Sequence, residues 1–179
     1  MKRILLTVVG VLVLAIVIVL VMAASKPDTY VVSRSIEIAT TPDAPFAKIN
    51  DLKKFNEWNP WMKADPNAKL NYSGPSEGPN SSYSWESTVT GAGEMTISES
   101  RPNEAVVYDM HFKKPFDGKA KASFSLVPQG ELTKVTWSME GQQKFLGKII
   151  HVFMDMNQMI GGEFEKGLAD LKAQIERKE

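Results

Sequence analysis

The chain has 179 residues, with 21 basic and 21 acidic side chains and no cysteine. This balance provides no dominant basic surface, so we expect no nucleic-acid partner. The lack of cysteine excludes disulfides, thiol catalysis and thiolate metal sites.

An unbroken apolar run extends from Ile4 to Ala24 and contains no charged residue. As a helix it would be about 30 Å long, which is close to the thickness of the hydrocarbon layer of a bilayer. We therefore predict a single-pass membrane anchor at residues 1–25. Lys2 and Arg3 would stay on the cytoplasmic side, so the remainder would be extracytoplasmic. The alternative is a cleaved signal sequence, which would leave a secreted domain, although signals usually have shorter apolar regions.

The rest of the chain has the composition of one water-soluble domain. We expect a short linker at residues 26–29 and a domain at residues 30–179, which is long enough to bury a sizeable core. Without Lys2 and Arg3, the chain has 19 basic and 21 acidic residues. This slight negative charge argues against strong electrostatic adhesion to anionic headgroups.

The first half of the domain is predicted to begin with a strand at Tyr30–Ala39. Arg34 falls on the apolar face of that strand, where its head either reaches water or binds a buried anion. Thr41 is predicted to cap a helix that ends near Leu52. The aromatic segment Phe55–Trp61 follows, ended by Pro60, and residues 64–82 read as a loop with a short strand at 69–72.

The second half alternates between apolar and polar residues, which predicts further strands near residues 83–87, 94–98, 105–112, 119–127 and 132–140. Gly91–Gly93 is predicted to form a turn. Short connections indicate an antiparallel sheet with one face in water. One long apolar stripe from Phe145 to Ile175 predicts a helix, interrupted at Gly161–Gly162, that covers the other face.

The segments Arg34–Trp61, Leu132–Gly141 and Gly161–Glu176 resemble the opening signature, last strand and C-terminal helix of the SRPBCC, or START-like, superfamily. The polyketide cyclase/dehydrase branch is the most similar. The resemblance covers about residues 30–176 and implies an α+β helix-grip fold, in which a curved antiparallel sheet wraps around a long C-terminal helix. It does not specify an activity, because the superfamily includes lipid carriers, hormone receptors, cyclases and co-chaperone domains.

The resemblance also implies a cavity between the sheet and the long helix. The alternation pattern and the aromatic segment predict ligand-binding residues that are rich in methionine and aromatic side chains, which suit adaptable apolar ligands. The alternative is that the same side chains simply fill a core. They are Trp58, Trp61, Trp85, Met95, Ile97, Tyr108, Met110, Phe124, Trp137, Met139, Met156, Met159, Ile160 and Phe164.

No catalytic motif is evident in the sequence. Glu57, between indoles, and Tyr108 are the candidates for an acid or base. His151 and Asp155 are spaced as neighbours on a helix, but no third ligand lies close in sequence, so we expect no metal site and no cofactor.

Three hypotheses follow. The leading one is a membrane-anchored domain that binds a hydrophobic or amphipathic small molecule, such as a lipid. The second is a cyclase- or hydrolase-type enzyme acting on an apolar substrate. The third is a protein-interaction domain with a filled core, for which an exposed Trp58–Trp61 patch would be expected.

Overall fold

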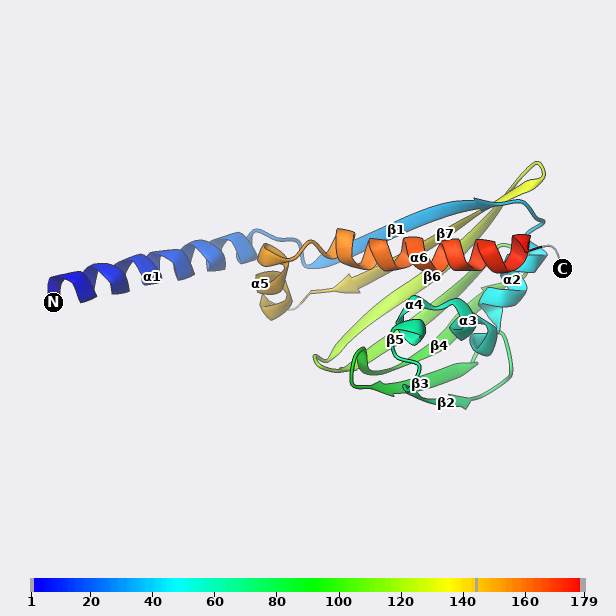
Figure 1. Ribbon diagram of the computed structural model, residues 1–179, viewed down its shortest axis with the longest axis horizontal. Helices are drawn as coiled ribbons and strands as arrows, with labels where there is room; N and C mark the ends of the chain where they lie inside the picture. The colour runs from blue at the N-terminus through cyan, green and yellow to red at the C-terminus, as the bar shows by residue number, and fades with distance from the viewer. Residues whose placement is uncertain (1, 144, 178–179) are drawn as a thin grey trace.

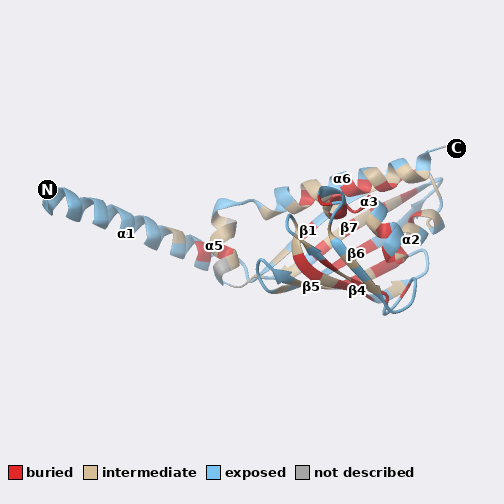
Figure 2. Ribbon diagram, turned by 60° about the horizontal axis from the view of Figure 1, so that its bottom comes forward, coloured by how far each residue is buried: buried red, intermediate tan, exposed pale blue. Residues whose placement is uncertain are grey.

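The computed structural model describes residues 2–143 and 145–177. A long helix, α1 (Lys2–Ala24), extends away from a curved sheet that is covered on one face by helices (Figure 1). α1 is long and apolar enough to cross a membrane, and its side chains are exposed along nearly all of its length (Figure 2). The predicted apolar helix is therefore present.

The sheet has seven strands in the order β1-β7-β6-β5-β4-β3-β2, and every neighbouring pair is antiparallel. Their alternating apolar side chains face the helices, which gives the predicted α+β helix-grip fold. The short strand predicted at residues 69–72 is confirmed as β2. The strands are β1 (Thr29–Ile38), β2 (Lys69–Ser73), β3 (Ser82–Ser87), β4 (Gly91–Arg101), β5 (Ala105–Lys114), β6 (Gly118–Gln129) and β7 (Leu132–Gln142).

The strand register defines the two ends of the sheet. Thr29, where β1 begins after α1, pairs with Gln142 at the end of β7. The β5–β6 turn lies at this same end, because Gly141 of β7 pairs with Ala120 near the start of β6. We call this end, from which α1 emerges, the α1 end of the sheet.

Three short helices follow β1, namely α2 (Asp43–Asn50), α3 (Leu52–Trp58) and α4 (Pro60–Ala64). The prediction that Thr41 caps α2 was wrong, because its hydroxyl hydrogen-bonds to the Asp43 side chain and Pro42 occupies the cap position. The prediction that Pro60 ends the aromatic segment was also wrong. Pro60 begins α4, since its fixed φ suits the first turn of a helix, and the Asn59 side chain accepts a hydrogen bond from the Trp61 amide at 3.1 Å.

Gly91–Gly93 do not form the predicted turn but begin β4, and the chain turns at residues 88–90. Gly93 is needed for close packing, because a Cβ there would lie 2.5 Å from the Trp85 ring and 2.6 Å from the His111 carbonyl oxygen. The sequence showed a glycine at position 93, but the reason for it is not a turn. The neighbouring strands β3 and β5 leave no room there for a side chain.

The predicted long C-terminal helix is two helices, α5 (Phe145–Phe153) and α6 (Met156–Glu176). The break falls at Met154–Asp155 and not at Gly161–Gly162, which lie inside α6. Asp155 begins α6 by accepting a hydrogen bond from the Gln158 amide at 3.1 Å. Only α6 covers the sheet, lying chiefly along β1, whereas α5 packs against α1 (Figure 1).

Arg34 joins β1 to α6. Its Nε donates to Glu165 at 2.6 Å, and its Nη2 donates to the carbonyl and side-chain oxygens of Asn157 at 3.0 and 2.9 Å. Gly161 leaves room for the guanidinium, because a Cβ there would lie 2.1 Å from Nη2. The Arg34 side chain is 27% exposed, so its head reaches water in part, as one of the two predicted alternatives had it, but its Nε and Nη2 also hold the covering helix.

Candidate functional site

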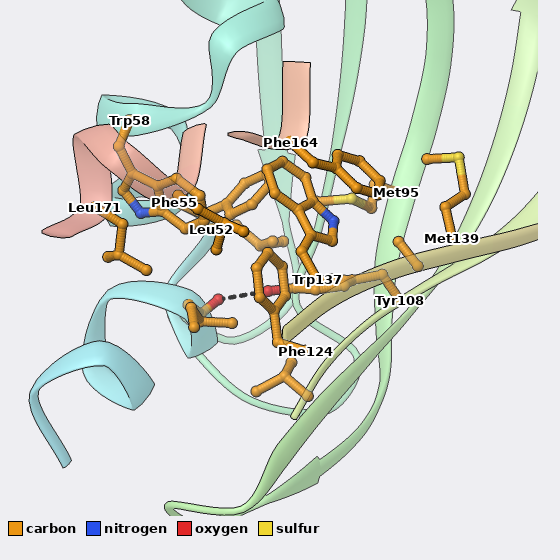
Figure 3. Packing of buried hydrophobic residues seen from close by; sticks show 14 of the residues in the cluster. Leu52, Phe55, Trp58, Met95, Tyr108, Phe124, Trp137, Met139, Phe164 and Leu171 are labelled. Carbon is orange, nitrogen blue, oxygen red and sulfur yellow. Dashed lines mark hydrogen bonds between the residues drawn. The ribbon is translucent and has the colours of Figure 1, made fainter. Parts of the chain in front are cut away.

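The middle of the domain is filled by aromatic rings that come from the sheet, from α6 and from α3. The register places Trp137 of β7 beside Phe124 of β6, and their ring centroids are 4.8 Å apart. Phe164 of α6 stacks on Trp137 at 4.2 Å. α3 contributes Phe55 and Trp58, which meet these rings edge-on (Figure 3). We call Phe55, Trp58, Tyr108, Phe124, Trp137 and Phe164 the aromatic core.

The aromatic segment predicted around Trp58 and Trp61 belongs to this interior. Trp58 is fully buried, and its indole nitrogen donates to the Lys48 carbonyl at 3.4 Å. Trp61 is half-buried and lies edge-on to Trp137 and Phe164. These two indoles therefore do not form the exposed patch expected for a protein-interaction surface.

Trp137 carries an unusual buried donor. Its residue is only 2% exposed, and its indole nitrogen has no hydrogen-bond partner among the described residues. In Figure 3 the nitrogen edge of the ring lies on the side of Met95 and Met139, away from Trp58. An unpaired buried N–H costs about 1–3 kcal/mol, so this atom is an available donor for an acceptor that enters the interior.

The other predicted ligand-binding residues differ in how far they are buried. Trp85, Met95, Ile97 and Met139 are buried in the sheet. Met110 of β5, which pairs with Met95, and Met156 and Ile160 at the start of α6 are half-buried, and Met159 is exposed. The accessible part of this set is therefore the start of α6, where Met156 and Met159 are flexible side chains.

Three further side chains belong to the same interior and were not predicted as ligand-binding. Phe55 joins the aromatic core, Phe112 contacts Trp85 edge-on, and Tyr30 donates from its hydroxyl to the Met139 sulfur at 3.7 Å. Phe55 and Phe112 had a signal in the sequence, since each belongs to an apolar face. Tyr30 had one as well, since it shares a face of β1 with Val32 and Ile36, but its contact with Met139 also depends on the space that Gly141 leaves beneath its ring.

The two candidate acid–base residues do not converge. Tyr108 is fully buried and donates to the Ile49 carbonyl at 2.8 Å, and burial raises the pKa of Tyr108 well above its ordinary value. Glu57 is exposed and lies 3.7 Å from the Lys48 ammonium. One group is sealed in the core and the other faces solvent, so they do not act on a common bound molecule in this conformation.

Within the described residues, no group of three or more His, Asp or Glu side chains is placed to hold a metal ion. His111 lies on the surface between Glu94 and Asp117, at 3.4 and 2.8 Å. The hydrogen bond from Lys113 and the neighbouring His111 lower the pKa of Glu94. The side chain of His151, one half of the pair considered above, lies outside the described part of the structure.

Two hollows in the described part of the chain lie away from the predicted lining residues. A groove of about 410 Å³ runs between α1 and α5, and a second hollow of about 360 Å³ lies where β1, β7 and α6 meet. The predicted lining residues instead pack mainly against one another.

The family assignment follows from the sequence itself. The family model described as polyketide cyclase/dehydrase and lipid transport matches residues 29–176. The chain belongs to this family. The match begins where β1 begins and ends with α6, so it covers the whole helix-grip fold and leaves out α1. The sequence matches no curated protein at a significant level.

Solved structures share the fold at low sequence identity. Truncated norcoclaurine synthase from Thalictrum flavum aligns with a TM-score of 0.62 and 13% identity, over 84% of this chain and 96% of that one. A protein from Chromobacterium violaceum aligns at 0.60 and 14%, over 86% and 100%. Aha1 from Colwellia psychrerythraea, solved as a dimer, aligns at 0.58 and 15%, over 82% and 96%. At such identities the similarity establishes the fold alone.

Proposed function

We propose that this chain is a membrane-anchored, extracytoplasmic domain that binds a hydrophobic or amphipathic small molecule between α6 and the α1 end of the sheet. The observation that carries the proposal is the unpartnered indole N–H of Trp137, buried among apolar side chains. Such a donor suits a largely apolar ligand with one hydrogen-bond acceptor, such as a carbonyl or ester oxygen. The lipid-transport function named in the family description supports the same ligand class.

The energetics of such binding are favourable without any charged contact. Burying about 200 Å² of apolar ligand surface contributes roughly 5 kcal/mol before the cost of association. A hydrogen bond to the Trp137 nitrogen adds about 1 kcal/mol and removes the penalty of an unpaired buried donor. Met139, Met156 and Met159 supply flexible side chains that can move aside.

The membrane location rests on α1. It has the length and composition of a membrane span, and Lys2 and Arg3 precede it. By the positive-inside rule these residues stay in the cytoplasm, which places the domain outside. A reporter enzyme that is active only outside the cytoplasm, fused after Glu179, tests this orientation. Retention of the full-length chain in membranes after an alkaline wash separates an anchor from a cleaved signal.

The binding test uses the full chain, solubilised in detergent and exposed to a lipid extract. Native mass spectrometry and extraction then identify any bound apolar molecule. We expect Trp137→Phe to weaken binding about tenfold, because the phenyl ring is apolar but lacks the donor. Trp58→Phe is the matched control, since it removes a second indole from the aromatic core whose N–H is already bonded to Lys48.

Failure to take up any apolar molecule would refute the proposal. Equal weakening by the two substitutions would show that lost packing, and not the Trp137 donor, is responsible. Loss of binding in Trp137→Phe alone identifies the acceptor-bearing ligand class.

A further inference from the structure

Exposed phenylalanines gather at the α1 end of the sheet. Phe116, Phe145 and Phe153 are 59%, 50% and 72% exposed, and they are the only strongly exposed phenylalanines in the described part of the chain. Large exposed aromatic side chains on one end of a domain mark a contact surface rather than a solvated one.

The strand register brings these side chains to one end although they are far apart in sequence. Phe116 lies in the β5–β6 turn, and Phe145 and Phe153 are the first and last residues of α5, which follows β7. Phe112 near the end of β5 pairs with Gly118 at the start of β6, so this turn points out of the α1 end. Residues 25–28, a linker of at most about 14 Å, join this end to α1.

α5 lies beside α1. The groove between them is lined by Leu12, Ala15, Ile16, Val19 and Leu20 of α1 and by Ile149 and Phe153 of α5. Lys148 points back to the linker, where its ammonium lies 2.5 Å from the Asp28 carboxylate. α5 is thus apolar toward the second half of α1 and charged toward the linker, which is the arrangement of a helix at a membrane surface.

We propose that α5 and the β5–β6 turn rest in the interfacial layer of the bilayer that α1 crosses, with lipid acyl chains and headgroups as the occupant of this apolar end. The inference rests on the membrane anchoring proposed above. It adds that the domain lies on the lipid instead of standing away from it on a flexible tether.

The contact is apolar rather than electrostatic. Lys113 and Lys114, which flank the β5–β6 turn, are already paired with Glu94 and Glu86 at 2.7 and 3.4 Å. Among the described lysines at this end, only Lys26 and Lys119 are exposed without an ion pair, so the apolar side chains carry most of the contact and it persists at high salt. The half-buried residues Met110, Met156 and Ile160 lie at the same end, so an apolar ligand would pass from the bilayer into the domain without crossing water.

Because the chain has no cysteine, single cysteines can report its position in the full-length protein. Phe116→Cys and Phe153→Cys place a fluorophore at the proposed contact. Val127→Cys is the matched control, since Val127 is 49% exposed but lies nine residues beyond Gly118 along β6, about 30 Å from the α1 end. Val11→Cys reports the insertion of α1.

Each labelled chain is reconstituted into phosphatidylcholine vesicles that contain a brominated lipid. We expect quenching at positions 116 and 153 to exceed that at 127 by about twofold or more, and to be unchanged in high salt. Quenching at 116 and 153 equal to that at 127, with strong quenching at 11, would overturn the inference and leave the anchor standing. Absence of quenching at 11 would refute the anchoring itself.

Discussion

Gly161 and Gly162 are adjacent in α6, and the structure predicts opposite effects when each is replaced by alanine. A Cβ on Gly161 would lie 2.1 Å from the Arg34 Nη2 and 2.3 Å from its Cζ, so the guanidinium must move. A Cβ on Gly162 would meet nothing within 4 Å. Since both residues are helical, both substitutions gain the same helix propensity, about 1 kcal/mol.

The difference between the two variants comes from Arg34. Moving its guanidinium breaks the hydrogen bonds to Asn157, which together contribute about 1–2 kcal/mol. The ion pair with Glu165 adds only about 0.5–1 kcal/mol, because the Glu165 side chain is 63% exposed. We therefore expect Gly161→Ala to be destabilising by about 1 kcal/mol and Gly162→Ala to be stabilising by up to about 1 kcal/mol.

Chemical denaturation of the full chain in detergent, followed by tryptophan fluorescence, measures the two free energies of unfolding. The control is the same pair of substitutions in an Arg34→Ala background, where the penalty at Gly161 should disappear and only the propensity gain remain. If Gly161→Ala is as stable as Gly162→Ala in the natural background, the reasoning that Arg34 needs the space over Gly161 is wrong.

Three further predictions concern the fold around the site. Tyr108→Phe should cost about 1–2 kcal/mol, because it leaves the buried Ile49 carbonyl without its donor. Burial raises the pKa of Tyr108 in the folded state, so the unfolded chain loses this proton first as the pH rises. The free energy of unfolding should therefore decrease above about pH 10. In Tyr108→Phe, denaturation at a series of pH values should show a decrease that is smaller by about 1.4 kcal/mol per pH unit. Gly93→Ala should lower the thermal unfolding midpoint by several degrees, whereas Gly118→Ala, with open space around it, should not. Asn59→Ala should cost about 1 kcal/mol in the same denaturation assay through loss of the α4 cap; an unchanged value would show that the cap is dispensable.

The interior of the domain is not a simple ligand cavity, because packed aromatic side chains fill its middle. Alternation along the strands identified correctly which side chains face the helices, because every second residue of a strand points to the same side. It could not show how closely they pack, since that depends on α3 and α4. Phe55 and Trp58 enter from α3 and close the middle of the fold, and Trp61 of α4 lies beside them against Trp137. Around this filled middle, side chains such as Met110 and Ile160 are only half-buried.

The sequence by itself determined the elements whose signal is local. The apolar run of α1, the alternation of the strands and the stripe of α6 are each set by residues that are neighbours along the chain, and they carried the family resemblance as well. Only the tertiary structure decided features that depend on distant partners. The role of Arg34 depends on Asn157 and Glu165 of α6. The indole nitrogen of Trp137 is known to be unpaired only when the positions of all neighbouring acceptors are known. The strand register brings Phe116 and Phe153 to the same end of the sheet. Whether a polar atom has a hydrogen-bond partner, and whether exposed side chains form one continuous surface, is decided only when segments far apart in sequence come together.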